Sequence, residues 1–365
     1  MRPADGEVLD RRTLNRALLA RQLLLERVAS KPVEAVEQLV GMQAQVPLDP
    51  YVGLWSRVVA FDPELFGREL LERRAVRMTL MRATIHLVSS ADAVRIRPLM
   101  QRMLERAFAS SPFARNLSGI DLVPVLARGR ELLDAEPMTL AQLRDALGRE
   151  WPGQDANSLA YAVRYLMPLV QVAPRGVWGM AMQPTLATLE QWLGAAEEEP
   201  STVDELILRY LRAFGPATAA DIRAWSWLPD VRAALGRLEP RLRCYRDETG
   251  RKLFDVPDGM FVDPETPAPV RFLPEYDNLF LSHADRGRIM DAVTWGSSFG
   301  HRGCFFVDGF LTGAWKLIGS KRERTLVVEG RRTLLAEERR GVKDEAEQLL
   351  VFLAPEGPRV LEFGG

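Results

Sequence analysis

The sequence predicts a mainly α-helical α+β fold with β-hairpins, in which three tandem winged-helix units precede a small β-barrel-like C-terminal domain. Two observations predict it. One pattern of helices and a hairpin recurs in the middle of the chain, and from about residue 270 hydrophobic residues alternate as in strands. The length of 365 residues suits two or three hydrophobic cores. We expect the units over residues 1–110, 111–200 and 201–260, and the C-terminal domain over 270–365.

The repeat is clearest in the segments PMTLAQLRDAL and PATAADIRAWS, which match at five positions with one constant offset. Thr139 and Gln142 have the spacing of a capping box, and Thr218 with Asp221 is a variant of it. Both segments are therefore predicted to begin a helix at equivalent places in two copies of one unit.

Each capped helix is preceded by a longer helix and followed by a helix and a hairpin, with predicted turns at 174–176 and 247–250. This is the order of a winged helix, in which the helix before the hairpin enters the DNA groove. Winged helices also bind proteins, but several in tandem favour nucleic acid as the partner.

The N-terminal region fits a decorated first copy. We expect helices over residues 14–27, 33–45, 48–60 and 63–73, a hairpin over 76–89 and a helix to about 109. Pro47 ends the second helix, because the residue before a proline avoids helical backbone. Segments 197–201 and 256–269 are predicted linkers, and the C-terminal strands accompany one helix.

The composition excludes several classes of function. With 48 basic and 49 acidic residues the net charge is −1, so any surface that attracts DNA must be local. The two cysteines, Cys244 and Cys304, suggest a reducing cytoplasm and no disulfide framework. The N-terminus lacks the apolar region of a secretory signal, and no apolar run is long enough to span a membrane.

Common catalytic motifs are also missing from the sequence. Three histidines without HExxH or CxxC spacing predict no metal site, and no phosphate-binding or dinucleotide-binding glycine loop is present. The GSSFG segment around Ser298 has the letters of a nucleophile elbow, but a turn and a strand follow it instead of a helix. We interpret it as a loop, and we expect no cofactor.

Gln43 and Gln45 are the remaining candidates, in the segment GMQAQVPLDPYVGLW. On a helix they would point nearly opposite ways, but on an extended chain before Pro47 they would share a face and could converge on one water. The alternative is a pair of solvated glutamines at a helix end. QAQ alone does not decide between these two possibilities.

The segments GMQAQVPLDPYVGLWSR, MRATIHLVS, GPATAADIRAWSWL, FLPEYDNLFLSHADR and DGFLTGAWK resemble the AlkZ/YcaQ-type winged-helix DNA glycosylases over essentially the whole chain. That family carries Gln-apolar-Gln or Gln-apolar-Asp, so Gln43-Ala44-Gln45 resembles the AlkZ-like branch. The resemblance implies a bacterial enzyme that hydrolyses the glycosidic bond of N7-alkylated guanine, with Gln43 and Gln45 as the catalytic pair. It also implies self-resistance to DNA-alkylating natural products, including those that crosslink strands.

Neutral amides suit that chemistry. N7-alkylguanine is already cationic, so its departure neutralises the base and needs no strong acid. A positioned water and a stabilised oxocarbenium-like sugar remain, and a glutamine carbonyl can assist both. We therefore expect a monofunctional DNA glycosylase without lyase activity, since the nearest lysine in sequence is Lys31.

Four other residues are weighed as site residues. Asp49 could supply a charge or be a turn residue before Pro50. His86, on the second predicted strand of the hairpin, could contribute to catalysis or be structural. Tyr51 and Trp55, one helical turn apart, could stack on DNA or pack in the core.

DNA binding is expected to rest on arginines near the three hairpins: Arg73, Arg74, Arg77, Arg82, Arg175, Arg246 and Arg251. Hairpin arginines contact phosphates or the minor groove, although exposed loops also carry solvated arginines. Double-stranded DNA with alkylated guanine is the expected partner of a monomeric protein in the cytoplasm, associated with the nucleoid. A DNA-binding regulator without catalysis and a protein-interaction scaffold remain alternatives.

Overall fold

The computed structural model describes residues 3–194, 198–290, 302–320 and 323–364. The helices are α1 (Arg11–Arg21), α2 (Pro32–Gln38), α3 (Asp49–Trp55), α4 (Pro63–Leu71), α5 (Ser90–Ala109), α6 (Pro112–Asn116), α7 (Leu122–Ala135), α8 (Leu140–Glu150), α9 (Ala156–Leu166), α10 (Leu189–Leu193), α11 (Val203–Phe214), α12 (Ala219–Ser226), α13 (Val231–Leu238), α14 (Asn278–Leu281) and α15 (Ala336–Leu353). Short 3₁₀ turns, η1 (Met81–Ala83) and η2 (Glu239–Arg241), complete the helical segments of this part of the chain.

The strands form three sheets. A six-stranded sheet has the order β2 (Met42–Gln43), β4 (Ile85–Ser89), β3 (Ala75–Thr79), β6 (Leu169–Gln171), β7 (Thr185–Thr188) and β5 (Met138–Thr139). β1 (Val8–Leu9), β8 (Arg243–Asp247) and β9 (Lys252–Asp255) form the second. The third contains β10 (Arg271–Leu273), β11 (Gly303–Val307), β12 (Phe310–Ser320), β13 (Glu323–Gly330) and β14 (Arg359–Gly364).

The predicted order of elements is present in the second and third units. Helices α7, α8 and α9 precede β6 and β7, and helices α11, α12 and α13 precede β8 and β9. Thr139 and Thr218 both form the predicted capping boxes. The α+β class is therefore confirmed, while the winged-helix assignment and the unit boundaries remain predictions.

The hairpins of the first two units join into one sheet. β3 pairs with β4 on one side and with β6 on the other, both antiparallel. The second hairpin turns at 174–176 as predicted, but the connection between its strands is longer than the turn, because β6 ends at Gln171 and β7 begins only at Thr185. The third hairpin does turn at 247–250.

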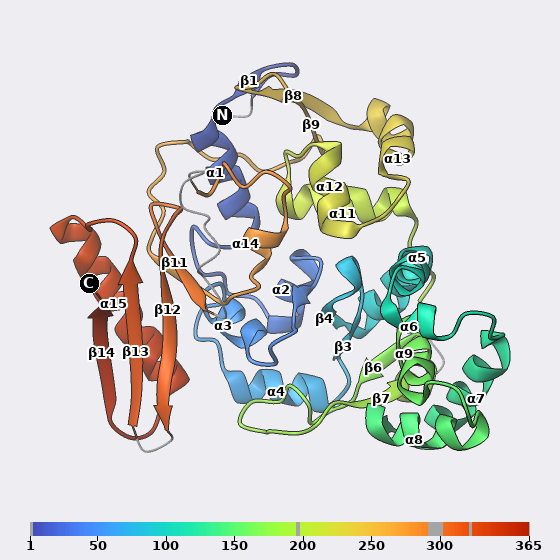
Figure 1. Ribbon diagram of the computed structural model, residues 1–365. Coiled ribbons are helices and arrows are strands. Elements are labelled where there is room, and N and C mark those ends of the chain that lie inside the picture. The colour runs from blue at the N-terminus through green and yellow to red at the C-terminus, as the bar shows by residue number, and fades with distance from the viewer. Residues whose placement is uncertain (1–2, 195–197, 291–301, 321–322, 365) are drawn as a thin grey trace.

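The C-terminal domain is an open sheet and not the predicted barrel. In the described residues β10 and β14 lie at opposite edges, and no pairing closes the sheet between them. β13 and β14 are parallel, and α15 provides the crossover between them and packs against the sheet. Figure 1 shows this domain at the left, the second unit at the lower right and the third at the top.

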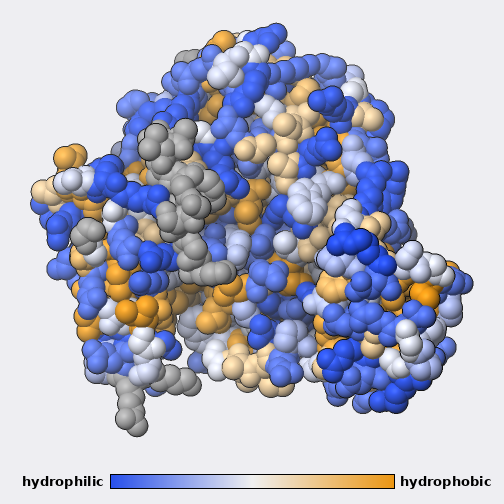
Figure 2. All heavy atoms as spheres, in the orientation of Figure 1, coloured by the Kyte–Doolittle hydropathy of each residue, from blue (hydrophilic) through white to orange (hydrophobic). Residues whose placement is uncertain are grey.

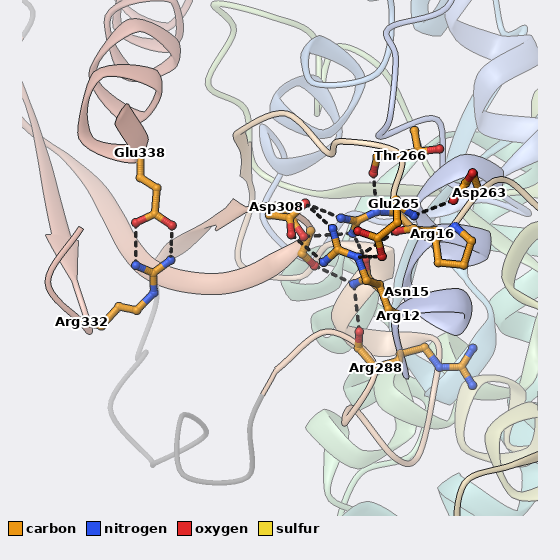
Figure 3. Close-up of polar contacts among 12 residues, drawn as sticks. Arg12, Asn15, Arg16, Asp263, Glu265, Thr266, Arg288, Asp308, Arg332 and Glu338 are labelled. Atoms are coloured by element: carbon orange, nitrogen blue, oxygen red, sulfur yellow. Dashed lines mark hydrogen bonds and ion pairs between the residues drawn. The ribbon is translucent and has the colours of Figure 1, made fainter. Parts of the chain in front are cut away.

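Helix α1, near the N-terminus, contacts the C-terminal domain and the segment that leads into it. The buried guanidinium of Arg16 donates to the carbonyl oxygens of Thr266 and Asp308, at 2.7 and 3.0 Å, and pairs with the Asp308 carboxylate. Asp308 lies in the turn between β11 and β12. Figure 3 shows Arg12 and Asn15, which belong to the same helix as Arg16, close to this turn. The N-terminal helix thus holds the C-terminal sheet against the rest of the molecule.

Hydrophobic side chains form one large shared core and smaller ones. The large core includes residues of α1, β3, β4, α5, α11, α12, α13 and β11, so the first and third units pack together. α7, α8 and α9 have a core of their own. Figure 2 shows hydrophilic residues over most of one face, with hydrophobic groups over the C-terminal sheet. No helix in the described residues is long and apolar enough to cross a membrane.

Candidate functional site

The Gln43–Gln45 segment leaves α2 through a sharp turn. Val40 and Gly41 have φ angles of 55° and 84°, and a Cβ on Gly41 would lie 2.7 Å from the Val88 side chain. Only glycine fits there. The Asn278 side chain donates to the Gly41 carbonyl at 2.8 Å and holds the turn. The helix predicted to reach residue 45 therefore ends at Gln38, and the chain enters β2.

Gln43 lies on the extended chain of β2, and Gln45 lies in a bend two residues further on. Gln43 opposes His86 in the antiparallel pairing of β2 with β4. The Ala44 amide donates to the Ile85 carbonyl at 2.7 Å, and the Ile85 amide lies 3.4 Å from Oε1 of Gln45. Gln43 is buried and Gln45 is exposed, so Gln45 is the one that solvent reaches.

Gln43 is held by the loop between β3 and β4. Its Oε1 accepts a hydrogen bond from Nη2 of Arg82 at 3.0 Å, and the Thr84 hydroxyl lies 3.3 Å away. Nη1 of Arg82 donates to the Trp225 carbonyl at 2.6 Å, which connects the loop to α12. Burial lowers the pKa of Arg82 to about 10, so its guanidinium remains charged at neutral pH. The side-chain amide of Gln43 is therefore fixed by a cation.

His86 contacts this cation. Its Nδ1 lies 3.0 Å from the Thr84 carbonyl, which only accepts, so Nδ1 carries the hydrogen and Nε2 faces Nη2 of Arg82 at 3.3 Å. Burial, followed by the charge of Arg82, lowers the pKa of His86 to about 3. The imidazole is therefore neutral with both nitrogens paired, which suits a structural role, and a part for His86 in catalysis stays a prediction.

Arg77 supports the segment from behind. Its Nη2 donates to the Ala44 carbonyl at 2.8 Å and lies 3.3 Å from Oε1 of Gln171 on β6. The residue is 3 % exposed, and burial lowers the pKa of Arg77 to about 10. The second unit thereby fixes the backbone between the two glutamines. The expectation that Arg77 contacts DNA is wrong for this structure, because its side chain is buried.

Asp49 differs from an ordinary turn residue. It begins α3, and its Oδ2 is buried without a hydrogen-bond partner among the described residues. Burial, and then the nearby charge of Glu275, raise the pKa of Asp49 to about 7. The carboxyl therefore titrates near neutral pH, four residues after Gln45.

A cleft of about 900 Å³ opens beside this network. Arg82 and Ala83 form one wall, with φ angles of 56° and 54°, and the other walls come from α5 and the two serines after it, from α9 and from the end of α12. Left-handed backbone on such residues costs about 1–2 kcal/mol each. Arg106 and Arg223 also line the cleft, and no acidic residue does. The lining of the cleft is therefore basic, and Arg82 connects it to Gln43.

The two aromatic candidates for stacking pack inside the protein. Tyr51 is 1 % exposed, and its hydroxyl donates to the Gly176 carbonyl at 2.9 Å. Trp55 is partly buried between Arg27 and Phe352. Core packing, the alternative considered from the sequence, therefore describes Tyr51 and accounts for the contacts of Trp55.

The remaining hairpin arginines are mostly engaged with the protein itself. Arg74 pairs with Glu69 and Glu72, and Arg251 pairs with Asp247 and Asp285. The others bond to backbone carbonyls: Arg73 to Trp192, Arg175 to Met182 and Arg246 to Gly250. Their role in DNA binding stays a proposal, since Arg73 and Arg246 are exposed.

Sequence reasoning missed Thr84, Arg106, Arg223 and Trp227. Arg223 and Trp227 are four residues apart at the end of α12, and this shared face was visible in ADIRAWSW. Asp277, in the segment PEYDN, forms a fully buried ion pair with Arg57 at 2.8 Å. Ser298 lies outside the described residues. Within them, no three histidines, cysteines and carboxylates gather as metal ligands.

Comparison with known proteins assigns the chain to a family. The family model for AlkZ-like DNA glycosylases matches residues 36–352. The chain belongs to the AlkZ-like DNA glycosylase family. The matched residues include Gln43, Gln45 and the loop of Arg82. The match supports DNA glycosylase activity, with DNA as the substrate.

A solved structure agrees with the fold of this AlkZ-like chain. The DNA glycosylase AlkZ of Streptomyces sahachiroi aligns with a TM-score of 0.74 and 21% sequence identity, over 98% of this chain and 100% of that one. At this identity the likeness shows a common fold. No curated protein matches the sequence.

Proposed function

We propose that this AlkZ-like protein is a monofunctional DNA glycosylase that hydrolyses the N-glycosidic bond of cationic N7-alkylguanine. Gln43 and Gln45 are its catalytic residues. One observation carries the proposal: two amides lie two residues apart at the end of β2, one of them held by the partly buried guanidinium of Arg82 and the other exposed to solvent. The neighbouring imidazole is neutral, so no strong acid adjoins the pair.

The two glutamines have different roles. Exposed Gln45 accepts a hydrogen bond from the attacking water through its carbonyl oxygen. Buried Gln43, whose Oε1 accepts hydrogen bonds from Arg82 and Thr84, keeps the segment that carries Gln45 rigid. As the C1′–N9 bond breaks, its electron pair goes to the base and neutralises the N7-alkyl cation. The water oxygen bonds to C1′ and its proton leaves to solvent.

A lyase step is not part of the proposal. In the described residues, none of the hydrogen bonds to Gln43, Arg82 or His86 comes from a lysine. A Schiff base needs an amine at the sugar. The open position of Gln45 suits a bulky adduct, and we include interstrand crosslinks of genotoxic natural products among the substrates, with self-resistance as the biological role.

Formation of abasic sites tests this function. The protein is incubated with duplex DNA carrying N7-methylguanine, and hot alkali then cleaves the strand at abasic sites. We expect cleavage with the wild type, about 100-fold less with Gln45→Ala, as for loss of one preorganised polar group, and none without alkali. Exposed Gln154 provides a matched control as Gln154→Ala.

Three outcomes are informative. Equal cleavage by wild type and Gln45→Ala would show that the pair is not catalytic. Cleavage without alkali would reveal a lyase. Intact DNA binding without cleavage of methylated or crosslinked DNA would favour the DNA-binding regulator.

A further inference from the structure

The cleft beside Gln43 has a charge that the protein itself does not neutralise. Arg106 on α5 and Arg223 on α12 are exposed, and neither forms an ion pair in the described part of the chain. By contrast, Arg74 and Arg251 at the hairpins are paired with carboxylates. Two unpaired guanidiniums that face one cleft without an acidic residue suit neighbouring phosphates.

Trp227 lines the same cleft in an unfavourable state. Its indole is 51 % exposed, and its φ and ψ of 59° and 15° are left-handed. Exposure and left-handed backbone both cost free energy for a bulky residue, and such strain concentrates at functional positions. Core packing does not explain the position of Trp227, because the nearby residues that fill the core are Trp225 and Leu228, whereas half of Trp227 is exposed.

Arg82 connects the cleft to Gln43, one of the two candidate catalytic residues. Arg82 lines the cleft and bonds both Gln43 and the carbonyl of Trp225, two residues before Trp227. A volume of about 900 Å³ is that of a pocket for a small ligand, so it holds a short piece of one strand and not a duplex. An exposed aromatic ring beside basic groups is the usual platform for an unpaired base.

We propose that this cleft binds one DNA strand next to the lesion. Arg106 and Arg223 hold successive phosphates, and the indole of Trp227 stacks on an unpaired base. That the ligand is DNA rests on the proposed function. The cleft would bind a short single-stranded part of that DNA.

Binding measurements without catalysis test it. The full-length protein is titrated with undamaged duplex and with duplex containing one unpaired base, over a series of salt concentrations. We expect the double variant Arg106→Gln/Arg223→Gln to bind both DNAs more weakly and to lower the slope of log K against log salt by about 1.8, or 0.9 for each lost contact. Arg128→Gln, which removes a half-buried arginine of α7 paired with Glu150, is the matched control and should change neither the affinity nor the salt slope.

Trp227 has its own signature. Trp227→Ala should weaken binding to the DNA with an unpaired base by about tenfold and binding to the intact duplex far less, and Trp227→Phe should restore most of the loss. Trp227→Gly should raise the melting temperature while it weakens the same binding, because glycine accepts left-handed backbone. A purely structural tryptophan would instead lose stability in all three variants.

Two results would overturn the proposal. One is an unchanged salt slope in the double arginine variant, and the other is an equal loss of affinity for both DNAs in Trp227→Ala. These outcomes are separate from failure of the proposed function. A protein that excises no base but shows the expected salt slopes and stacking would keep the strand-binding cleft and lose the glycosylase assignment.

Discussion

Nη2 of Arg82 lies 3.0 Å from Oε1 of Gln43, and the same guanidinium donates to the carbonyl of Trp225. One side chain therefore joins the candidate catalytic segment of the first unit to the cleft wall of the third. The arrangement depends on the fork of the guanidinium, since a lysine has one nitrogen to offer.

Arg82→Lys should distinguish the effect of holding Gln43 in place from the effect of the positive charge at residue 82. A hydrogen bond to a charged group contributes about 1.5–3 kcal/mol, so we expect base excision at saturating DNA to fall by about 10- to 100-fold. DNA affinity should change little, because the cation remains. Single-turnover excision and equilibrium binding measure the two effects. An equal loss in affinity would show that Arg82 acts on DNA alone.

Asp49→Asn should change how stability depends on pH. Burial raises the pKa of Asp49 to about 7 in the folded protein, above about 3.9 in the unfolded chain. The protonated carboxyl therefore adds stability below pH ~4, and this contribution is lost as the pH rises to about 7. Urea unfolding from pH 4 to 8 should show a decline in the wild type that the variant lacks. Parallel curves would contradict the raised pKa.

His86 should behave in the opposite sense. The pKa of His86 is lowered to about 3, below the unfolded value of about 6.5. The neutral ring therefore contributes to the stability of the fold above pH ~6.5, and this contribution is lost as the pH falls to about 3. Proton NMR should show the His86 ring neutral at pH 5. An imidazole that titrates near pH 6.5 would restore it as a candidate acid.

Arg77→Met should show that this arginine positions the segment and does not bind DNA. Loss of the guanidinium leaves the buried Ala44 carbonyl unpaired, which costs about 1–3 kcal/mol. We expect a lower free energy of unfolding and slower excision, with an unchanged salt slope of DNA binding. A decrease of about 0.9 in that slope would instead indicate a phosphate contact.

The sequence predicted the elements with local signals best. The capping boxes at Thr139 and Thr218 depend on residues within one turn, and the structure has both. The ends of the early helices were predicted less well. α2 stops at Gln38 because Gly41 and Asn278 turn the chain, and Asn278 is 237 residues away.

Partners that are distant in sequence also decide the candidate site. QAQ and the histidine were visible, but only the fold shows that Arg82 holds Gln43 and that Arg77 is buried behind Ala44. An arginine near a hairpin looks the same in sequence whether it faces DNA, a carboxylate or the core. The exposed left-handed Trp227 likewise had no local signal beyond its spacing from Arg223.

The contact between α1 and the turn at Asp308 has a consequence for biosynthesis. Arg16 and its partner Asp308 are 292 residues apart in the chain. At about 5–20 residues per second the ribosome adds Asp308 roughly 15–60 s after Arg16. The apolar side of α1 packs with residues of α5 and α11, which are made earlier, so only its polar side waits for the partner. Docking of the C-terminal sheet on α1 is therefore a late folding step, which follows assembly of the core that the first and third units share.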